Sequence, residues 1–234
     1  MAEQLPIVEV HDGIHVVRDD LFPGGTKARF IPALYDDVEE VVYATPCEGG
    51  AQTALAHVAA QIGKRATLFC AARKAPHPRT LMAQRLGAKV YPVSPGYLNV
   101  VQARAVEYAD QTGAKLAEFG IPQAVDAIAE AALATGLEPD EVWCASGSGT
   151  LARGLAKAWP WAARFAVQVG RDISARDTDG AIVVKEPLAF GQPYRGAVPF
   201  PSDPHYDAKA WAACKARHKG GLVVFWNVTG PAAP

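Results

Sequence analysis

The chain lacks the features that mark several large protein classes. No apolar run reaches the roughly 18 residues that a transmembrane helix needs. The first residues, MAEQLPIVEV, have neither the basic nor the apolar region of a signal peptide. The 23 basic and 24 acidic residues leave a formal net charge of −1, without a basic block. We therefore expect a cytoplasmic protein with no membrane partner and no dedicated nucleic-acid-binding surface.

Cysteine is scarce, with four residues in the chain: Cys47, Cys70, Cys144 and Cys214. No two of them form a C-x-x-C pair, and no histidine stands at metal-ligand spacing from them. The sequence therefore predicts no metal site. Cys70 and Cys144 lie in apolar runs, so we expect both to be buried free thiols.

Short apolar runs alternate with alanine-rich stretches of helical periodicity. The runs are almost continuously apolar, which is typical of strands buried on both faces of a parallel sheet. They cover residues 40–45, 66–70, 89–93, 141–144, 165–169, 181–185 and 222–226. Helices are predicted at residues 50–62, 79–86, 100–109, 122–133, 151–158 and 207–217. This alternation predicts an α/β fold with doubly wound, mostly parallel sheets.

Residues 170–204 interrupt the alternation, because they are rich in Asp, Gly and Pro. The segment reads as a long irregular connection. Within a compact domain such a connection is usually functional or mobile.

The segment RDDLFPGGTKAR, residues 18–29, carries the first candidate for chemistry. Gly24 and Gly25 directly precede a predicted helix start and let the backbone approach a ligand closely. We predict that Thr26 caps this helix and that Lys27 projects from its first turn. The positive end of the helix dipole disfavours the charged form of such a lysine, which suits imine formation with an aldehyde. An ordinary surface lysine after a Pro-Gly-Gly turn is the alternative.

A second glycine-rich turn joins the predicted strand 141–144 to the predicted helix 151–158. Backbone N–H groups at such a switch bind phosphate at the helix amino terminus. The turn lacks the P-loop lysine and the G-x-G-x-x-G pattern, so it suits one phosphate better than two or three. A simple tight turn is the alternative. The predicted phosphate-binding residues are Ser146, Gly147, Ser148, Gly149 and Thr150.

Five segments, in order along the chain, resemble those of tryptophan-synthase-β-like (fold type II) enzymes, which use pyridoxal phosphate (PLP). They are RDDLFPGGTKAR, RTLMAQRLGAKVYPV, CASGSGTLARGL, DPHYDAKAW and VVFWNVTG. The nearest branch is that of 1-aminocyclopropane-1-carboxylate deaminase and D-cysteine desulfhydrase. The resemblance covers most of the chain and implies the fold of that group, in a shortened form, with pyridoxal 5'-phosphate as cofactor.

The resemblance also implies roles for single residues. Lys27 would hold the cofactor as a Schiff base and then move the α-proton, while residues 146–150 would hold the phosphate. Tyr206 would be an acid–base group or a carboxylate contact; an aromatic anchor for the helix 207–217 is the alternative. Thr229 would hydrogen-bond the pyridine nitrogen and, as a neutral hydroxyl, leave it largely unprotonated.

The loop before the second predicted helix departs from the family pattern. The family has a Ser-Asn pair there, and the asparagine touches the cofactor's phenolic oxygen. Here the loop reads TPCEGGAQ, residues 45–52, and a glycine falls at the asparagine position. The backbone amides of Gly49 and Gly50 are candidate cofactor contacts. Thr45, Gln52 and Arg29 are candidate substrate contacts.

The chain is also shorter than the full-length enzymes, which predicts an open site, or one completed by a second subunit in a homodimer. An open site suits an amino acid group carried on a large molecule. Relatives of this kind in phages act in DNA hypermodification, where they are thought to decarboxylate an aminoacyl group on thymine. The host cytoplasm would then be the location. Arg18 and Arg195 are further candidate partners for a substrate carboxylate.

We expect residues 36–115 to form a small α/β domain. Residues 1–35 and 116–234 would form a larger PLP-binding domain that carries the lysine and the phosphate loop. The leading interpretation is a PLP-dependent lyase that forms an aldimine with an α-amino acid moiety. It would cleave a bond at Cα by decarboxylation, or by proton loss with elimination or deamination. The alternatives are a non-catalytic PLP-binding protein or subunit, and a phosphometabolite-binding α/β domain without PLP.

Overall fold

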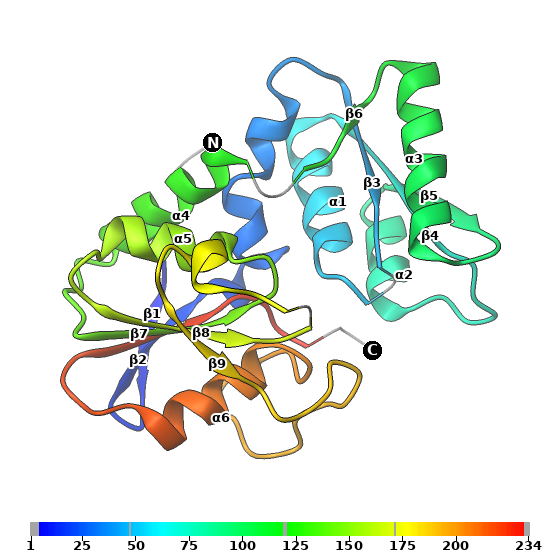
Figure 1. The fold of residues 1–234 in the computed structure, drawn as a ribbon. Helices are drawn as coiled ribbons and strands as arrows, with labels where there is room; N and C mark the ends of the chain where they lie inside the picture. Colours follow the sequence, from blue (N-terminus) through cyan, green and yellow to red (C-terminus); the bar gives the residue numbers. More distant parts are fainter. Residues whose placement is uncertain (1–4, 47, 119–120, 171, 232–234) are drawn as a thin grey trace. The chain divides into compact units, whose positions relative to one another are not determined.

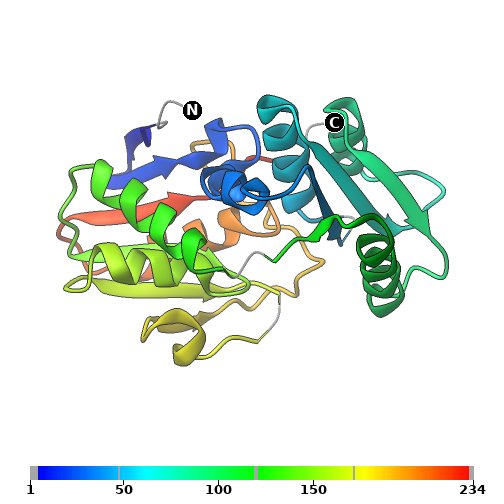
Figure 2. The same cartoon turned by 90° about the horizontal axis from the view of Figure 1, so that it is seen from above.

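The computed structural model describes residues 5–46, 48–118, 121–170 and 172–231, which form two compact units (Figures 1 and 2). The first unit contains the described residues up to Phe22 and those from 121 to 231. The second contains residues 23–118.

The first unit is built on a six-stranded sheet in the order β1-β2-β10-β7-β8-β9. The strands are β1 (Val8–His11), β2 (Ile14–Arg18), β7 (Glu141–Ser146), β8 (Ala163–Gln168), β9 (Ile182–Lys185) and β10 (Val223–Asn227). Only β1 runs antiparallel to its neighbour. The helices are α4 (Pro122–Ala134), α5 (Thr150–Ala158) and α6 (Asp207–Arg217), with short 3-10 helices η1 (Asp19–Leu21) and η4 (Ala175–Thr178). Helices α4 and α5 cover one face of this sheet and α6 covers the other (Figure 1).

Aromatic side chains fill the core of the first unit. Trp143 on β7 stacks on Phe165 of β8, with ring centroids 4.1 Å apart, and Phe225 of β10 packs against Trp211 of α6. On the opposite face α4 and α5 approach closely at Gly154. This packing fixes the strand ends and the loops that follow them.

The second unit has a four-stranded parallel sheet in the order β5-β4-β3-β6. Its strands are β3 (Glu40–Ala44), β4 (Arg65–Ala71), β5 (Lys89–Val93) and β6 (Lys115–Leu116). Its helices are α1 (Ala51–Ile62), α2 (Pro78–Arg85) and α3 (Leu98–Thr112), with 3-10 helices η2 (Gly25–Arg29) and η3 (Ile31–Tyr35). Helices α1 and α2 pack together on one face, and α3 lies on the other (Figure 2).

The predicted α/β fold with mostly parallel sheets is confirmed, and every helix and strand predicted by its residue range is present with ends shifted by a few residues. The helix predicted to begin at Thr26 is instead the 3-10 helix η2. The hairpin of β1 and β2 was not predicted. Its signal is the two-residue turn Asp12-Gly13, where both residues have positive φ, as type I′ hairpin turns require. Strand β6, of two residues, is too short to leave a sequence pattern.

The division into units differs from the predicted domains at residues 116–118, which belong to the second unit, and at residues 23–35. Residues 23–35 pack on α1 and belong to the second unit, not to the larger one. The contact is tight, since a Cβ on Gly24, whose φ is +97°, would stand 2.6 Å from the Cα of Ala54. The expected cap is also different. The residue before η2 is Gly24, in the left-handed region, and Thr26 lies inside the 3-10 helix.

Cys70, Cys144 and Cys214 are buried free thiols, as predicted for the first two, whereas Cys47 lies outside the described residues. None of the helices in the described ranges is long and apolar enough to cross a membrane. Within the same ranges no three His, Cys, Asp or Glu side chains are grouped so as to hold a metal ion.

Candidate functional site

The loop between β7 and α5 is the centre of the site in the first unit. Ser146 ends β7 and is buried, and Thr150 begins α5. Gly149 lies between them with a φ of +85°. A Cβ on Gly149 would stand 2.0 Å from the carbonyl oxygen of Asp177, so the chain can pass here only with glycine.

Three residues of this loop carry hydroxyl groups. Ser148 Oγ and Thr150 Oγ1 are hydrogen-bonded at 3.1 Å, and Arg153 Nη2 reaches Thr150 Oγ1 at 3.5 Å. Ser146 Oγ and Arg153 Nε are buried and have no hydrogen-bond partner within the described part of the chain. Buried polar atoms are normally paired, so these two atoms can donate to an anionic ligand. The loop therefore fits an oxyanion, and Arg153, which the sequence analysis missed, adds a cation.

Tyr206 lies beside the same loop. It directly precedes α6 and is half-buried. Its hydroxyl oxygen is 3.6 Å from the place that a Cβ on Gly147 would take. On its other side the ring of Phe190 packs edge-on, at 5.3 Å between centroids. The structure thus brings Tyr206 and the predicted phosphate loop together, 59 positions apart in the chain when counted from Gly147.

Thr229 follows β10, which neighbours β7 in the sheet. Its N–H donates to Oδ2 of Asp207 at 3.2 Å, and its carbonyl accepts from the N–H of Asp203 at 3.0 Å. Asp207 is fully buried. Burial, together with the nearby Asp207 carboxylate, raises the pKa of Cys144 to about 12. Asp207 was missed in the sequence, although it directly follows Tyr206 in the DPHYD segment.

Lys27 is half-buried in the middle of η2, and Arg29 ends that 3-10 helix. The contact of Gly24 with Ala54 fixes the segment on α1. The lysine therefore projects from a rigid support within the second unit.

The loop that leads into α1 is held by its own side chains. Gln52 is fully buried, donates to the carbonyl of Gly49 at 3.1 Å and accepts from the hydroxyl of Thr80 at 2.9 Å. The hydroxyl of Thr45 donates to the carbonyl of Pro46 at 2.8 Å. Both predicted substrate contacts therefore also hold the shape of the loop.

A buried arginine explains why glycine stands at position 50. Arg79, on α2, is only 7% exposed, and its Nη1 is 3.2 Å from the place that a Cβ on Gly50 would take. A longer side chain at position 50 would displace this guanidinium group. Arg79 is thus a neighbour of this loop that no local pattern in the sequence indicated.

Arg18 has a structural role instead of the predicted one. It is buried, its Nε and Nη2 each donate to Asp20 at 2.8 Å, and its Nη1 is paired with Glu9. The hydrogen bonds that Arg18 donates to Asp20 raise the pKa of Arg18. This ion-pair network is satisfied within the first unit, so Arg18 is not a site for a substrate carboxylate. Arg195 is exposed in the irregular connection.

The predicted site residues thus fall into two groups, one in each unit. Residues 146–150, Tyr206 and Thr229 gather at the carboxyl ends of β7 and β10 in the first unit. Lys27, Arg29, Thr45 and the Gly49-Gly50 loop belong to the second unit. Ligands of parallel α/β sheets bind at the carboxyl ends of strands.

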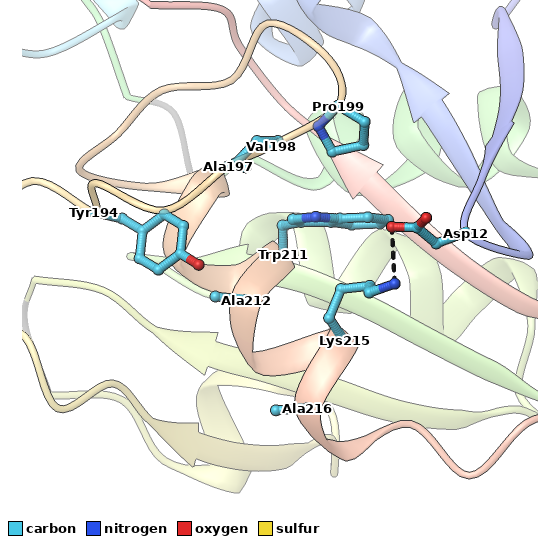
Figure 3. A pocket seen from close by; sticks show the side chains of 9 residues that line it. All are labelled: Asp12, Tyr194, Ala197, Val198, Pro199, Trp211, Ala212, Lys215 and Ala216. Carbon is cyan, nitrogen blue, oxygen red and sulfur yellow. Dashed lines mark ion pairs between the residues drawn. The ribbon is translucent and has the colours of Figure 1, made fainter.

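The cavity drawn in Figure 3, of about 490 Å³, contains none of the predicted site residues. It lies on α6 near the β1–β2 turn, where Lys215 and Asp12 form an ion pair of 2.8 Å. Its lining residues are Asp12, Tyr194, Ala197, Val198, Pro199, Trp211, Ala212, Lys215 and Ala216.

Comparison with known proteins gives one family. Residues 6–196 match the family described as "Pyridoxal-phosphate dependent enzyme". No curated protein sequence matches the chain.

Several solved structures share the fold. An ACC deaminase homologue has a TM-score of 0.74 and 16% identity, with 93% of this chain and 84% of that chain covered. Threonine deaminase isoform 2 from Solanum lycopersicum has a TM-score of 0.74 and 14% identity, with 97% and 80% covered. A hydrogen sulfide-producing enzyme from Fusobacterium nucleatum has a TM-score of 0.70 and 15% identity, with 97% and 92% covered. At this identity the likeness is one of fold.

Proposed function

Because this chain belongs to the family of pyridoxal-phosphate-dependent enzymes, whose cofactor is pyridoxal 5'-phosphate, we propose that it cleaves a bond at Cα of an α-amino acid moiety. The observation that carries the proposal is the β7–α5 loop, where the buried Ser146 hydroxyl has no hydrogen-bond partner within the described residues. Family membership sets aside the alternative of a phosphometabolite-binding domain without PLP. The phage DNA-hypermodification branch stays a prediction.

The phosphate end of the cofactor fits the residues of the first unit. The hydroxyls of Ser146, Ser148 and Thr150, with the backbone N–H groups of Gly147 and Gly149, would hold it at the amino terminus of α5. The helix dipole favours an anion there. The guanidinium of Arg153, also on α5, adds a charge-assisted contact.

Thr229 and Asp207 are the residues we assign to the pyridine ring. When bound, the cofactor withdraws electrons from a bond at Cα and so stabilises the negative charge left there. Asp207 is fully buried and accepts a hydrogen bond from the N–H of Thr229. As a carboxylate beside the ring nitrogen it would favour the protonated form of that nitrogen. This revises the role predicted from Thr229 alone, because a protonated ring withdraws electrons more strongly.

Lys27 and Tyr206 are assigned the proton transfers. The amine of Lys27 would hold the cofactor, and as a free amine it would accept or return the proton at Cα. The Tyr206 hydroxyl, beside Gly147, is the second acid–base group. The N–H group of Gly50 would contact the ligand, whereas that of Gly49 already donates to the carbonyl of Pro46 at 2.9 Å.

Arg29 keeps its assignment as a candidate substrate contact. Thr45 and Gln52 are buried and hydrogen-bonded to Pro46 and Gly49, so they would act by holding the shape of the loop. Arg29 shares η2 with Lys27 and supplies a cation for a carboxylate.

Proton loss followed by elimination or deamination is the branch that we favour. The similar structures include a threonine deaminase and a hydrogen sulfide-producing enzyme, and diaminopropionate ammonia lyase from Escherichia coli matches with a TM-score of 0.66. Decarboxylation of an aminoacyl group on thymine in phage DNA would use the same residues. Product analysis separates the two, since one releases ammonia or another leaving group and the other releases CO₂. We also propose a homodimer, which sedimentation at several concentrations would test.

The visible absorption spectrum tests the proposal most directly. Purified protein loaded with PLP should show the Schiff-base band, and borohydride reduction followed by peptide mapping should find the cofactor on Lys27. The Lys27→Ala variant should lose the band. Lys74→Ala, at an exposed lysine of the same unit, should keep it.

A band retained by the Lys27→Ala variant would contradict the assignment of the lysine. If the band forms but no amino acid or aminoacyl nucleoside is turned over, the alternative of a non-catalytic PLP-binding protein or subunit is correct.

A further inference from the structure

An exposed aromatic ring lies beside the proposed acid–base tyrosine. Phe190 belongs to the irregular connection between β9 and α6, and 38% of its surface is exposed. Its ring meets that of Tyr206 edge-on, with centroids 5.3 Å apart and planes at 83°. The Tyr206 hydroxyl lies beside Gly147 on its other side. The side chain of Tyr206 therefore lies between Phe190 and the proposed phosphate loop.

Phe190 also lies over the carboxyl end of β8. Its Cδ2 is 3.5 Å from the place that a Cβ on Gly170 would take, and Gly170, with φ of +91°, leaves room for the ring. The preceding residue, Val169, donates its N–H to the carbonyl of Ser146 at 3.0 Å. The ring is thus at the sheet edge where ligands of parallel α/β folds bind.

A buried lysine holds the backbone next to Phe190. Lys209, on α6, is 1% exposed, and its Nζ donates to the carbonyls of Ala189 at 2.9 Å and Leu188 at 3.5 Å. The ring of His205 donates to the carbonyl of Phe190 at 3.2 Å. Desolvation lowers the pKa of Lys209, against the charges of Glu186 and Asp203. Bonds from a buried amine restrict where this backbone can lie.

We infer that Phe190 determines which side group the substrate carries, by forming an apolar wall beside Tyr206, and that Lys209 is the positioning residue for this wall. The inference rests on the proposed function. An exposed ring loses contact with water when an apolar or flat side group packs on it, and aromatic pairs gain further from their geometry. The substrate class is then an α-amino acid moiety with an apolar or aromatic group.

The binding of two amino acids to the PLP-loaded protein tests this wall. L-Phenylalanine and L-alanine are titrated separately, and the change in cofactor absorbance gives a dissociation constant for each. The natural chain should bind L-phenylalanine more tightly than L-alanine. In Phe190→Ala the ratio of the two constants should change by about threefold to tenfold in favour of L-alanine. Trp161→Ala, which removes a ring that is 61% exposed in the same unit, should leave the ratio unchanged.

The possible failures are distinguishable. If the natural chain binds no PLP, both the proposed function and the inferred role of Phe190 are wrong. If PLP binds as expected but Phe190→Ala keeps the ratio of the natural chain, only the inferred role of Phe190 is wrong. The same holds if the natural chain does not prefer L-phenylalanine to L-alanine. Phe190 is exposed, so its truncation leaves the fold intact.

The Lys209→Met variant tests whether Lys209 positions Phe190 or only stabilises the fold. If Lys209 acts through Phe190, this variant should bind PLP as the natural chain does but shift the ratio in the same direction as Phe190→Ala. An unchanged ratio in folded Lys209→Met protein would overturn the positioning role. If Lys209→Met does not fold, Leu188→Ala and Ala189→Gly, which perturb the same backbone from the loop side, decide the question by the same ratio.

Discussion

Ser146 and Cys144 show what single residues contribute in this molecule. They lie on one strand, β7, and both are buried. The hydroxyl of Ser146 has no partner within the described residues, whereas the thiol of Cys144 is surrounded by the core. The first therefore affects binding and the second affects stability.

Removal of the Ser146 hydroxyl should weaken cofactor binding without loss of stability. In Ser146→Ala the dissociation constant for PLP should rise about tenfold, because one hydrogen bond to a charged phosphate is lost. The free energy of unfolding without PLP should not fall, since the hydroxyl has no partner to lose. Absorbance titration and urea unfolding measure the two. Thr112→Ala, in the second unit, is the control for PLP binding only, because its hydroxyl donates to the carbonyl of Tyr108 and accepts from the N–H of Ala114. An unchanged dissociation constant would contradict the role of Ser146.

Cys144 should make the protein less stable at high pH. Burial raises its pKa from 9.0 to about 12. The thiol stays protonated in the folded state, while the unfolded chain ionises above pH 9. Its contribution is therefore complete below pH 9 and is lost as the pH rises from 9 towards 12, by up to about 1.4 kcal/mol per pH unit. Urea unfolding at pH 8, 9 and 10 would show this slope, and Cys144→Ala should reduce it. An equal slope in the variant would refute the prediction.

At the scale of helices and strands, the close approach of α4 and α5 depends on one glycine. A Cβ on Gly154 would stand 2.4 Å from Cγ2 of Ile128. Gly154→Ala should therefore lower the free energy of unfolding by about 1–3 kcal/mol, as overpacking does. Gly191→Ala, where a Cβ meets no atom within 4 Å, should leave it nearly unchanged. Because α5 carries the phosphate loop, the cofactor should also bind less tightly to Gly154→Ala. Equal stability of the two variants would mean that the helices can move apart freely.

The elements themselves follow from local pattern, and their partners do not. The continuous apolar runs predicted β3, β4, β5, β7, β8, β9 and β10, because burial on both faces requires such runs. The Asp12-Gly13 hairpin was overlooked although its turn signal is present. No pattern within residues 23–29 indicated that they pack on α1, since that contact depends on Gly24 and Ala54 together.

At the scale of the whole molecule, cofactor binding should be visible as thermal stabilisation. At a free PLP concentration one hundred times the dissociation constant, binding adds about 2.7 kcal/mol, which should raise Tm by about 5–10 °C for a chain of this size. Pyridoxal without its phosphate should stabilise much less, because it does not use residues 146–150. Differential scanning calorimetry with both compounds would measure this. Equal shifts with the two would argue against the phosphate loop.

The sequence by itself determined the α/β alternation and the cofactor, and it predicted the phosphate loop, because periodicity and glycine spacing are properties of contiguous residues. The five ordered segments also pointed to the family that the chain belongs to. Only the tertiary structure decided which distant residues join those loops. Asp207 meets Thr229, Phe190 meets Tyr206 and Arg79 meets Gly50, because strand order and helix packing bring them together. Contacts of this kind depend on the fold of each unit, which no local pattern encodes.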